Sequence, residues 1–275
     1  MTTQNTQGCE TCPVHNVGNL TKLGVDMKDA DYVVALAGNP NTGKSTVFNA
    51  LTGLRQHTGN WPGKTVTRAE GGFLFAEKRY KIVDLPGTYS LLSASTDEDI
   101  ARNFILFGQP DVTVIVVDAT RLERNLNLVL QVLEITDRAV VCLNLTDEAK
   151  RHGLTVDDRL LTKGLGVPVV PTAARQGIGM KDLLQAISDV ANGVYKCRPR
   201  RMRSHSHSLE SALGTLTKKL KAEFPGLANA RWVALRLLDG DDRIIEAVKS
   251  GELADLARSE WGGVEPAHAE TEEVV

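Results

Sequence analysis

Residues 38–45 read Gly-Asn-Pro-Asn-Thr-Gly-Lys-Ser, which completes the pattern G-x-x-x-x-G-K-[ST]. An apolar run, Tyr32–Ala37, precedes the pattern and an amphipathic stretch, Thr46–Leu51, follows it, as a strand–loop–helix phosphate site requires. Glycines let the backbone wrap around phosphate, and backbone N–H groups at a helix N-terminus face the anion. Lys44 neutralises the terminal phosphates, and the Ser45 hydroxyl stands where a magnesium ion would bind. The motif therefore predicts binding of a nucleoside triphosphate.

Three shorter motifs, each at the end of a predicted strand, favour guanine as the base. Asp84 and Gly87 belong to Asp-Leu-Pro-Gly, in which the carboxylate holds magnesium through water and the glycine N–H reaches the γ-phosphate. Asn144 and Asp147 belong to Asn-Leu-Thr-Asp, whose last carboxylate accepts two guanine N–H groups that adenine lacks. Residues 171–174, Pro-Thr-Ala-Ala, offer backbone N–H to the guanine carbonyl. Together the motifs predict a GTP site.

Alternating strand and helix patterns occupy residues 32–195. The runs at 112–117 and 139–143 are apolar throughout, as central parallel strands covered on both faces are. The pair within 70–84, with Glu77-Lys78 at its turn, predicts an antiparallel hairpin. Strands are expected at 32–37, 68–75, 78–84, 112–118, 139–144 and 167–171, and helices at 44–52, 98–107, 122–136, 157–164 and 179–192. This order predicts a doubly wound α/β domain with a mostly parallel six-stranded sheet and ligands at the carboxyl ends of its strands.

The pattern changes after residue 195. Helical patterns at 207–223, 229–238, 241–250 and 252–261 predict a small all-α domain. The predicted organisation is a disordered N-terminal tail at 1–31, a GTP-binding domain at 32–195, a basic linker at 196–206, the helical domain at 207–262 and a disordered acidic tail at 263–275.

Bulk composition limits the function classes. The chain has 275 residues, 42% of them hydrophobic and 24% charged, and a formal net charge of −2, so nothing draws the whole molecule to nucleic acid. Four cysteines do not suggest a disulfide framework. No apolar run approaches the ~18–20 residues that cross a bilayer, and the first thirty residues lack the apolar core of a signal peptide. We expect this chain to be soluble.

Four segments carry a specific family resemblance. Residues 38–49, 59–66, 84–91 and 144–150 resemble the cytosolic G-protein domain of FeoB ferrous-iron transporters, a P-loop GTPase fold. Residues 231–238 resemble the helical, nucleotide-dissociation-inhibitor-like domain that follows it in the family. The resemblance covers roughly 32–262. It implies the cytoplasmic part of a bacterial inner-membrane protein whose pore lies beyond residue 275. The implied partners are its own transmembrane domain and small accessory proteins, without nucleic acid, and a homo-oligomer is an option.

The resemblance also implies roles for matched residues. Ser45 and Thr65 would ligate Mg²⁺ together with Asp84, Thr65 only when the first switch closes on GTP. The implied catalytic residues are Asn41, Lys44, Thr65 and Gly87. The implied GTP or GDP contacts are Asn39, Asn41, Thr42, Gly43, Lys44, Ser45, Thr46, Gly63, Thr65, Asp84, Gly87, Asn144, Asp147, Thr172, Ala173 and Ala174.

Asn41 resembles the asparagine that supports potassium binding in potassium-activated members of the family. A K⁺ ion there would supply positive charge to the transferring phosphoryl group, the task that other GTPases give to an arginine finger. The alternative is an asparagine that only shapes the loop, because Asn is common in turns. Potassium activation is therefore a hypothesis.

Five other positions bear on turnover or nucleotide release. Thr88 stands where Ras-like enzymes have glutamine, so we expect slow intrinsic hydrolysis. Asp97 and Glu98 match an acidic pair of the family that supports the site. We prefer the alternative that they stabilise the N-terminus of the helix that they begin. His57 is expected to be an exposed loop residue rather than a general base. Leu145 replaces the lysine of many GTPases, which predicts micromolar affinity and fast GDP release.

Two features lie outside the nucleotide motifs. Cys9-x-x-Cys12, followed by His15, has the spacing of a metal or redox pair, but a flexible tail with two thiols is the preferred reading. The basic linker at 196–203 either meets anionic lipid or is a solvated connection, and we favour the latter.

These observations predict a GTP-hydrolysing switch that regulates Fe(II) uptake, using Mg²⁺ and K⁺. The γ-phosphate would hold residues 55–67 and 87–97, and hydrolysis would release them. One alternative is a free-standing ribosome- or tRNA-linked GTPase, which is disfavoured because no compact basic RNA-binding domain follows. Another is a nucleotide-gated binding module that signals by occupancy rather than turnover.

Overall fold

The computed structural model describes residues 17–27, 30–53, 56–92, 95–201, 206–225, 227, 229–251, 253 and 254. The Cys-x-x-Cys motif, His15 and the acidic tail lie outside these residues, as does most of the helix expected at 252–261. The chain divides into two compact units, Met1–Ala212 and Leu213–Val275. Among the described residues, no helix combines the length and the apolar character that a bilayer span needs.

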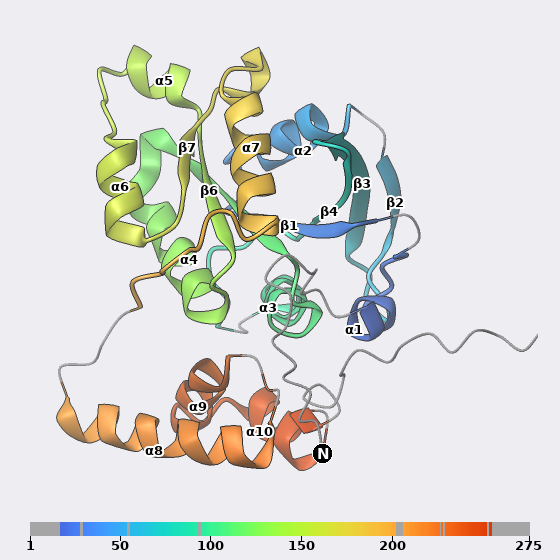
Figure 1. The fold of residues 1–275 in the computed structure, drawn as a ribbon, viewed down its shortest axis with the longest axis vertical. Coiled ribbons are helices and arrows are strands. Elements are labelled where there is room, and N and C mark those ends of the chain that lie inside the picture. Colours follow the sequence, from blue (N-terminus) through green and yellow to red (C-terminus); the bar gives the residue numbers. More distant parts are fainter. Residues whose placement is uncertain are drawn as a thin grey trace, which may run out of the picture. The chain divides into compact units, whose positions relative to one another are not determined.

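A seven-stranded sheet forms the centre of the first unit, in the order β2-β3-β4-β1-β5-β6-β7 (Figure 1). β4, β1, β5, β6 and β7 are parallel, whereas β2 and β3 add an antiparallel edge. The strands are β1 Tyr32–Gly38, β2 Gln56–Asn60, β3 Thr67–Phe75, β4 Lys78–Asp84, β5 Val112–Asp118, β6 Ala139–Asn144 and β7 Val169–Pro171. The predicted α/β P-loop fold is confirmed.

The prediction of six strands is wrong, because it missed β2. Its sequence, Gln-His-Thr-Gly-Asn, has no apolar alternation, and the strand pairs only with the β3 backbone. Edge strands of this kind leave little periodic signal. The predicted turn of the β3–β4 hairpin is also one residue late: Phe75 pairs with Lys78, so Ala76 and Glu77 form the turn, with φ values of 48° and 61°. Positive φ at both central residues is the I′ geometry that suits the twist of a hairpin.

Helices cover both faces of the sheet (Figure 1). α2 and α7 pack together with β1, β4, β5 and β6, whereas α3 and α4 pack together with β1 and β5 and α1 contacts α3. The helices are α1 Val17–Lys22, α2 Lys44–Thr52, α3 Thr96–Gly108, α4 Leu122–Ile135, α5 Thr146–Arg151, α6 Asp158–Leu165 and α7 Met180–Ala191. Every residue of β1, β5 and β6 is buried, which is why these runs are apolar throughout.

Two short helices differ from the predictions. α1 lies in the range expected to be a disordered tail, where Leu20 is fully buried and Asn19 Nδ2 donates to the Phe107 carbonyl at 3.0 Å. α5 follows β6 directly and was also not predicted. Each has six residues, too few to show a helical period.

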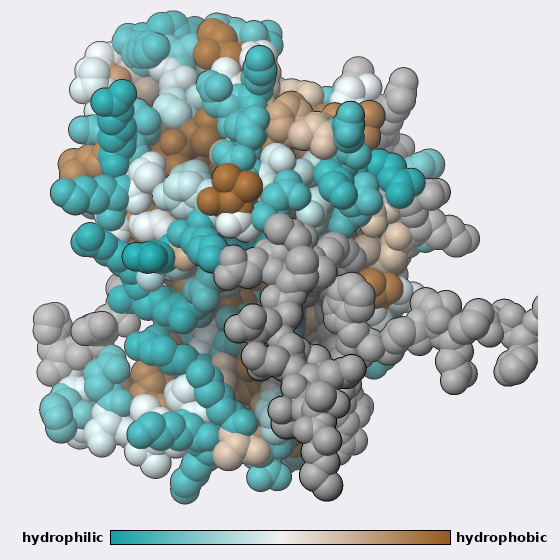
Figure 2. All heavy atoms as spheres, viewed as in Figure 1, coloured by the Kyte–Doolittle hydropathy of each residue, from teal (hydrophilic) through white to brown (hydrophobic). Residues whose placement is uncertain are grey.

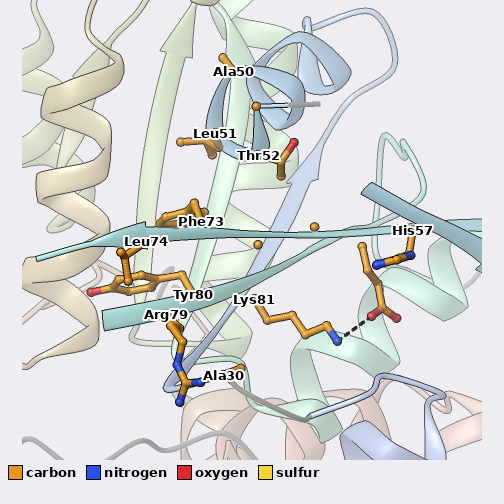
Figure 3. A pocket seen from close by; sticks show the side chains of 14 residues that line it. Ala30, Ala50, Leu51, Thr52, His57, Phe73, Leu74, Arg79, Tyr80 and Lys81 are labelled. Carbon is orange, nitrogen blue, oxygen red and sulfur yellow. Dashed lines mark ion pairs between the residues drawn. The ribbon is translucent and has the colours of Figure 1, made fainter. Parts of the chain in front are cut away.

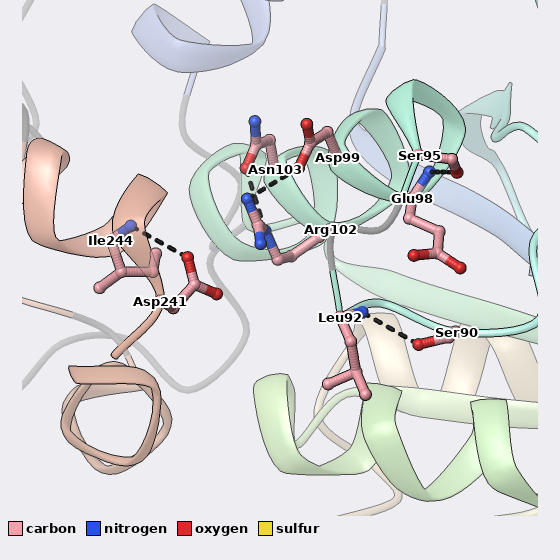
Figure 4. Close-up of polar contacts among 9 residues, drawn as sticks. All are labelled: Ser90, Leu92, Ser95, Glu98, Asp99, Arg102, Asn103, Asp241 and Ile244. Atoms are coloured by element: carbon pink, nitrogen blue, oxygen red, sulfur yellow. Dashed lines mark hydrogen bonds and ion pairs between the residues drawn. The ribbon is translucent and has the colours of Figure 1, made fainter. Parts of the chain in front are cut away.

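Three helices follow, α8 His207–Glu223, α9 Ala230–Leu238 and α10 Asp242–Lys249, close to their predicted bounds. Trp232, Val233, Ile244 and Ala247 are buried. Asp241 caps α10 by accepting a hydrogen bond from Ile244 N at 3.2 Å (Figure 4). On the visible face of the molecule, hydrophilic residues predominate and hydrophobic ones are scattered (Figure 2).

Candidate nucleotide site

The phosphate loop joins β1 to α2 through two backbone positions with positive φ. Asn41 has φ 67°, and Gly43 has φ 79°. A Cβ at Gly43 would lie 2.5 Å from Asn144 Nδ2, so only glycine fits at this close approach. α2 begins at Lys44, and its positive dipole end opens on the loop. The loop therefore has the backbone geometry of an anion cradle.

Asn39 supplies a test of whether this loop fits a polar ligand. The residue is 2% exposed, and neither its amide nitrogen nor its amide oxygen has a partner in the described part of the chain. Thr42, equally buried, donates its hydroxyl to the Asn39 carbonyl at 2.9 Å. Buried polar groups are nearly always hydrogen-bonded, so the orphaned amide fits a site that a polar ligand completes.

Lys44 and Asp84, predicted for the phosphates and for magnesium, lie together. Lys44 Nζ forms an ion pair with Asp84 Oδ1, and the two side chains are only 12% and 18% exposed. Burial raises the pKa of the Asp84 carboxyl above its ordinary value, and the Lys44 ammonium opposes that rise. No group of three His, Cys, Asp or Glu able to hold a metal occurs among the described residues. The Ser45 and Asp84 oxygens still suit Mg²⁺, which takes few protein ligands and completes its shell with phosphate and water.

The loop after β4 lies against the phosphate loop. Thr88 N donates to the Gly38 carbonyl at 3.3 Å, and a Cβ on Gly87 would lie 3.5 Å from Pro40 N. The Thr88 hydroxyl donates to the Ser90 carbonyl at 2.6 Å and accepts from Ser90 N at 3.2 Å. This hydroxyl is therefore occupied within its own turn rather than positioned to orient a water molecule.

Two residues of α4, which the sequence analysis missed, hold the rest of that loop. Gln131 Oε1 accepts from Leu91 N at 2.6 Å and from Ser90 Oγ at 3.3 Å. The Arg124 guanidinium lies 4.3 Å from the centre of the Tyr89 ring. Ser90 Oγ also accepts from Leu92 N at 3.0 Å (Figure 4). Arg124 and Gln131 are seven residues apart, on one face of the helix, which is the only local signal that could have suggested them.

Asn144 connects three loops. Its Nδ2 donates to the Thr42 carbonyl at 3.0 Å, and its Oδ1 accepts from Ala174 N at 3.1 Å and from Thr172 Oγ1 at 3.3 Å. The residue is 1% exposed. Both ends of its amide are therefore used inside the protein, which fixes the phosphate loop against the two predicted guanine loops.

Asp147, the predicted guanine acceptor, lies in the first turn of α5. Its Oδ2 accepts from Gln176 Nε2 at 2.9 Å and lies 3.5 Å from an Arg151 nitrogen. Gln176 was not predicted, because a contact across 29 residues leaves no local pattern. The carboxylate is 24% exposed, which leaves it accessible to a base that displaces the glutamine.

The segment 172–174 lies beside these residues, but its N–H groups have protein acceptors. Thr172 N donates to the Leu143 carbonyl at 2.8 Å, Ala173 N to the Ile178 carbonyl at 3.1 Å, and Ala174 N to Asn144 Oδ1. The predicted contact from this segment to the guanine carbonyl therefore requires the loop to shift.

Thr65 and Gly63 are not brought to the phosphate loop by any described contact. Both are exposed in the turn between β2 and β3, where Lys64 N donates to the Trp61 carbonyl at 3.0 Å. The Trp61 side chain is 2% exposed and packs edge-on against Phe104 of α3, with ring centres 5.7 Å apart. One end of this loop is thus anchored while Thr65 stands free of the core.

Asp97 and Glu98 lie in the first turn of α3, together with Asp99. Ser95 caps the helix by accepting from Glu98 N at 3.3 Å, and Asp99 pairs with Arg102 at 3.0 Å (Figure 4). This placement agrees with the preferred reading, stabilisation of a helix N-terminus.

A hollow of about 890 Å³ between α2 and the β3–β4 hairpin contains none of the predicted site residues (Figure 3). Phe73 and Tyr80 line it, and Lys81 pairs with Glu70 at 3.1 Å. His57 also lines it; the residue is exposed as expected, but it lies in β2 rather than in a loop. The hollow is therefore separate from the nucleotide site.

The sheet, the loop after β1 and the Asn-x-x-Asp segment after β6 define a P-loop domain that binds guanine nucleotide. The family model described as "Ferrous iron transport protein B" matches residues 32–187, and the "FeoB cytosolic helical domain" model matches 205–273. The chain belongs to the FeoB family of ferrous iron transport proteins.

Relatives and solved structures agree. The Fe(2+) transporter FeoB of Salmonella choleraesuis strain SC-B67 is 41% identical over 230 residues, 80% of this chain and 28% of the transporter. The apo cytosolic domain of T. maritima FeoB is similar with a TM-score of 0.73 and 36% identity, covering 82% of this chain and 92% of that one. Its GMPPNP form matches with a TM-score of 0.70 and 35% identity, covering 86% and 88%. The chain thus spans about a quarter of the length of its curated relatives.

Proposed function

We propose that this chain is the GTP-hydrolysing switch of a ferrous iron transporter. One observation carries the proposal: Lys44, Asp84, Gly87, Asn144 and Asp147 come from three separate segments and meet at the carboxyl edge of the sheet. This edge is where open α/β sheets bind their ligands. A structural relative is described in GDP and GMPPNP forms.

The chain's residues divide the work of binding. The loop backbone from Asn39 to Thr46 surrounds the phosphates, and Lys44 leaves Asp84 to neutralise the β- and γ-phosphates. Ser45, Thr65 and, through water, Asp84 would hold Mg²⁺, which would offset the charge of the phosphates. Asp147 reads the guanine edge, while Asn144 holds the loops in register.

Turnover in this proposal is slow without a monovalent ion. Gly87 offers its N–H to the γ-phosphate, but the Thr88 hydroxyl is used in its own turn and orients no water. Asn41 is exposed at a left-handed position and has no side-chain hydrogen bond to the described residues. Its amide oxygen is therefore available to hold K⁺ beside the transferring phosphoryl group.

The transporter role rests on the relatives. They are Fe(2+) transporters more than three times as long as the match, so the pore belongs to sequence that this chain lacks. In the proposal the chain lies at the cytoplasmic face of an inner membrane, joined to its own transmembrane domain and open to small accessory proteins or to self-association. The γ-phosphate holds residues 55–67 and 87–97, and the helical domain passes their release on hydrolysis towards the membrane.

The test is GTP hydrolysis by this chain in potassium and in sodium buffer, with Asn41→Ala and Lys44→Ala alongside. Stimulation by potassium alone, lost in Asn41→Ala while GTP affinity persists, supports the mechanism and assigns Asn41. Equal slow rates in both salts remove the potassium step. A Lys44→Ala rate equal to that of the unmodified chain would contradict the whole site.

The Thr88 geometry also favours a second candidate, a module that signals by occupancy. A residue that cannot orient water makes a poor hydrolase but an adequate binding switch. Measuring the separation of labels on the two units with GDP and with GMPPNP distinguishes the two. A separation that GMPPNP changes from its GDP value, and that after loading with GTP returns at a rate unrelated to GTP hydrolysis, favours occupancy.

A further inference from the structure

A groove in the first unit lies between α6 and the segment that follows α7, well separated in sequence from the nucleotide motifs. Its volume is about 560 Å³, and no acidic residue is among those that line it. Its cationic lining residues are Arg159, Lys163, Lys196, Arg198 and Arg200. We call this the basic groove.

Backbone geometry explains why these charges converge. Arg159 and Lys163 are four residues apart on α6 and share one helical face. The facing segment is extended, so alternate residues such as Arg198 and Arg200 project to the same side. Arg198 N donates to the Gly166 carbonyl at 2.8 Å, which holds this segment against the end of α6 (Figure 1).

Gly166 permits that close approach. Its φ is 77°, and a Cβ there would lie 1.9 Å from the Arg198 carbonyl oxygen. Arg200 N donates to the Leu165 carbonyl at 3.1 Å, which extends the pairing. The two rows of cations are therefore fixed by main-chain contacts rather than by the side chains themselves.

Four of the five cations that line the groove have no partner among the described residues. The side chains of Arg159, Lys163, Arg198 and Arg200 are exposed and make no hydrogen bond or ion pair with any described residue. The neighbouring Arg201, by contrast, pairs with Asp137 at 2.5 Å. The chain as a whole has more acidic than basic residues, so this concentration is local. Like charges held together repel one another, and a polyanion relieves that repulsion.

Apolar side chains flank the groove. Val194 is 75% exposed, and Tyr195, which lines the groove, is 38% exposed. Exposed apolar or aromatic residues beside arginine and lysine suit the interface of an anionic bilayer, where the rings and stems enter the headgroup region. Single-stranded nucleic acid would instead require several aromatic stacking platforms, and Tyr195 is the one aromatic residue in the lining.

We propose that the basic groove binds the phosphate headgroups of anionic lipids and docks the GTP-binding unit on the membrane surface. The proposal rests on the chain being part of a membrane transporter, as its relatives are. It does not depend on hydrolysis, because the groove shares no lining residue with the nucleotide site.

Co-sedimentation of the full 275-residue chain with vesicles tests the proposal. The chain should bind vesicles of phosphatidylcholine with phosphatidylglycerol and not vesicles of phosphatidylcholine alone, and added salt should weaken the binding. Each cation near an anionic surface contributes about fivefold, so Arg198→Gln with Arg200→Gln should weaken binding about 25-fold. Lys78→Gln with Lys181→Gln removes the same charge from exposed positions elsewhere and should leave most of the binding intact.

Two further arms identify the source of phosphate. Inorganic phosphate or an unstructured RNA that binds the chain in an Arg198- and Arg200-dependent way, without vesicle binding, would overturn the lipid assignment. Equal losses in the two double variants would overturn the groove itself. GTP hydrolysis is measured on the same samples: a chain that binds vesicles but does not hydrolyse GTP contradicts only the proposed function.

Discussion

Two loops of the first unit differ in the contacts that hold them. Residues 61–66 connect β2 to β3, and residues 87–92 follow β4. The second loop is secured at every step: Thr88 bonds to the phosphate loop, Ser90 and Leu91 to Gln131, and Tyr89 stacks under Arg124. In the first loop Trp61 packs against Phe104 and its backbone N–H donates to the Val66 carbonyl, but Thr65 stands exposed. One loop is thus preformed, whereas the other leaves Thr65, its proposed Mg²⁺ ligand, exposed.

This contrast suggests a division of labour. A preformed loop loses little conformational entropy when it meets the γ-phosphate, so it contributes affinity. A loop that becomes ordered only around Mg²⁺ and GTP costs more entropy, and it distinguishes GTP from GDP for that reason. The proposal therefore places most of the switching in residues 61–66.

The largest expected effect is that of Lys44→Ala. This change should weaken nucleotide binding, so that neither loop has a bound phosphate to contact. Truncating one partner of a buried charge pair commonly costs about 100-fold in affinity. We expect GTP and GDP affinity to fall by that factor in a fluorescent-nucleotide titration. Lys44→Arg is the control for charge; affinity retained in Lys44→Ala would show that the ion pair with Asp84 is its only role.

The next effect separates the loops. Thr65→Ala should slow hydrolysis by about 100-fold, as loss of a transition-state contact does. The same change should alter the free energy of unfolding by less than about 0.5 kcal/mol, because the side chain is exposed. Thr88→Ala should instead lower the free energy of unfolding, by about 1 kcal/mol in urea, because two hydrogen bonds are lost. Its effect on hydrolysis should be smaller than that of Thr65→Ala. Similar stability losses in both variants would refute the contrast.

Sequence patterns predicted the parts of the site that backbone geometry dictates. Gly43 is required by its positive φ and by the approach of Asn144, and the buried runs of β1, β5 and β6 are apolar because helices cover both faces. Each of these requirements concerns a single position or a short run of residues, so a local sequence pattern is enough to predict it.

The contacts that hold the loops could not be predicted in this way. Gln131 lies 40 residues from Leu91, and Gln176 lies 29 residues from Asp147. Glutamine is common on helix surfaces, so nothing local marks either residue. β2 was missed for a related reason: a polar edge strand is recognised by its pairing with β3 and not by its own residues.

Gln131 permits a smaller and sharper test of the preformed loop. Gln131→Ala removes an acceptor for Leu91 N and Ser90 Oγ, at a cost of about 1 kcal/mol, and hydrogen exchange at Leu91 should quicken about fivefold or more. Gln131→Glu places a carboxylate oxygen where the amide oxygen accepts these bonds and should restore protection. Exchange within 61–66 should stay the same in both variants. Faster exchange in both loops would mean that α4 supports the whole edge.

The smallest expected effect concerns Asp84, the last residue of β4, three residues before the preformed loop. Burial holds the folded-state pKa of this carboxyl above its ordinary value. Because the pKa of the Asp84 carboxyl is higher in the folded chain than in the unfolded chain, its protonated form favours folding. This contribution is complete below the pKa of the unfolded chain and is lost as the pH rises through the pKa of the folded chain. Ionised Asp84 therefore costs stability at neutral pH, and Asp84→Asn removes that cost. Relative to the unmodified chain, Asp84→Asn should gain stability in urea unfolding as the pH rises above about 4, where the carboxyl ionises in the unfolded chain. A relative loss over that range would show that the ion pair with Lys44 outweighs burial, and that the site is built for stability rather than for magnesium.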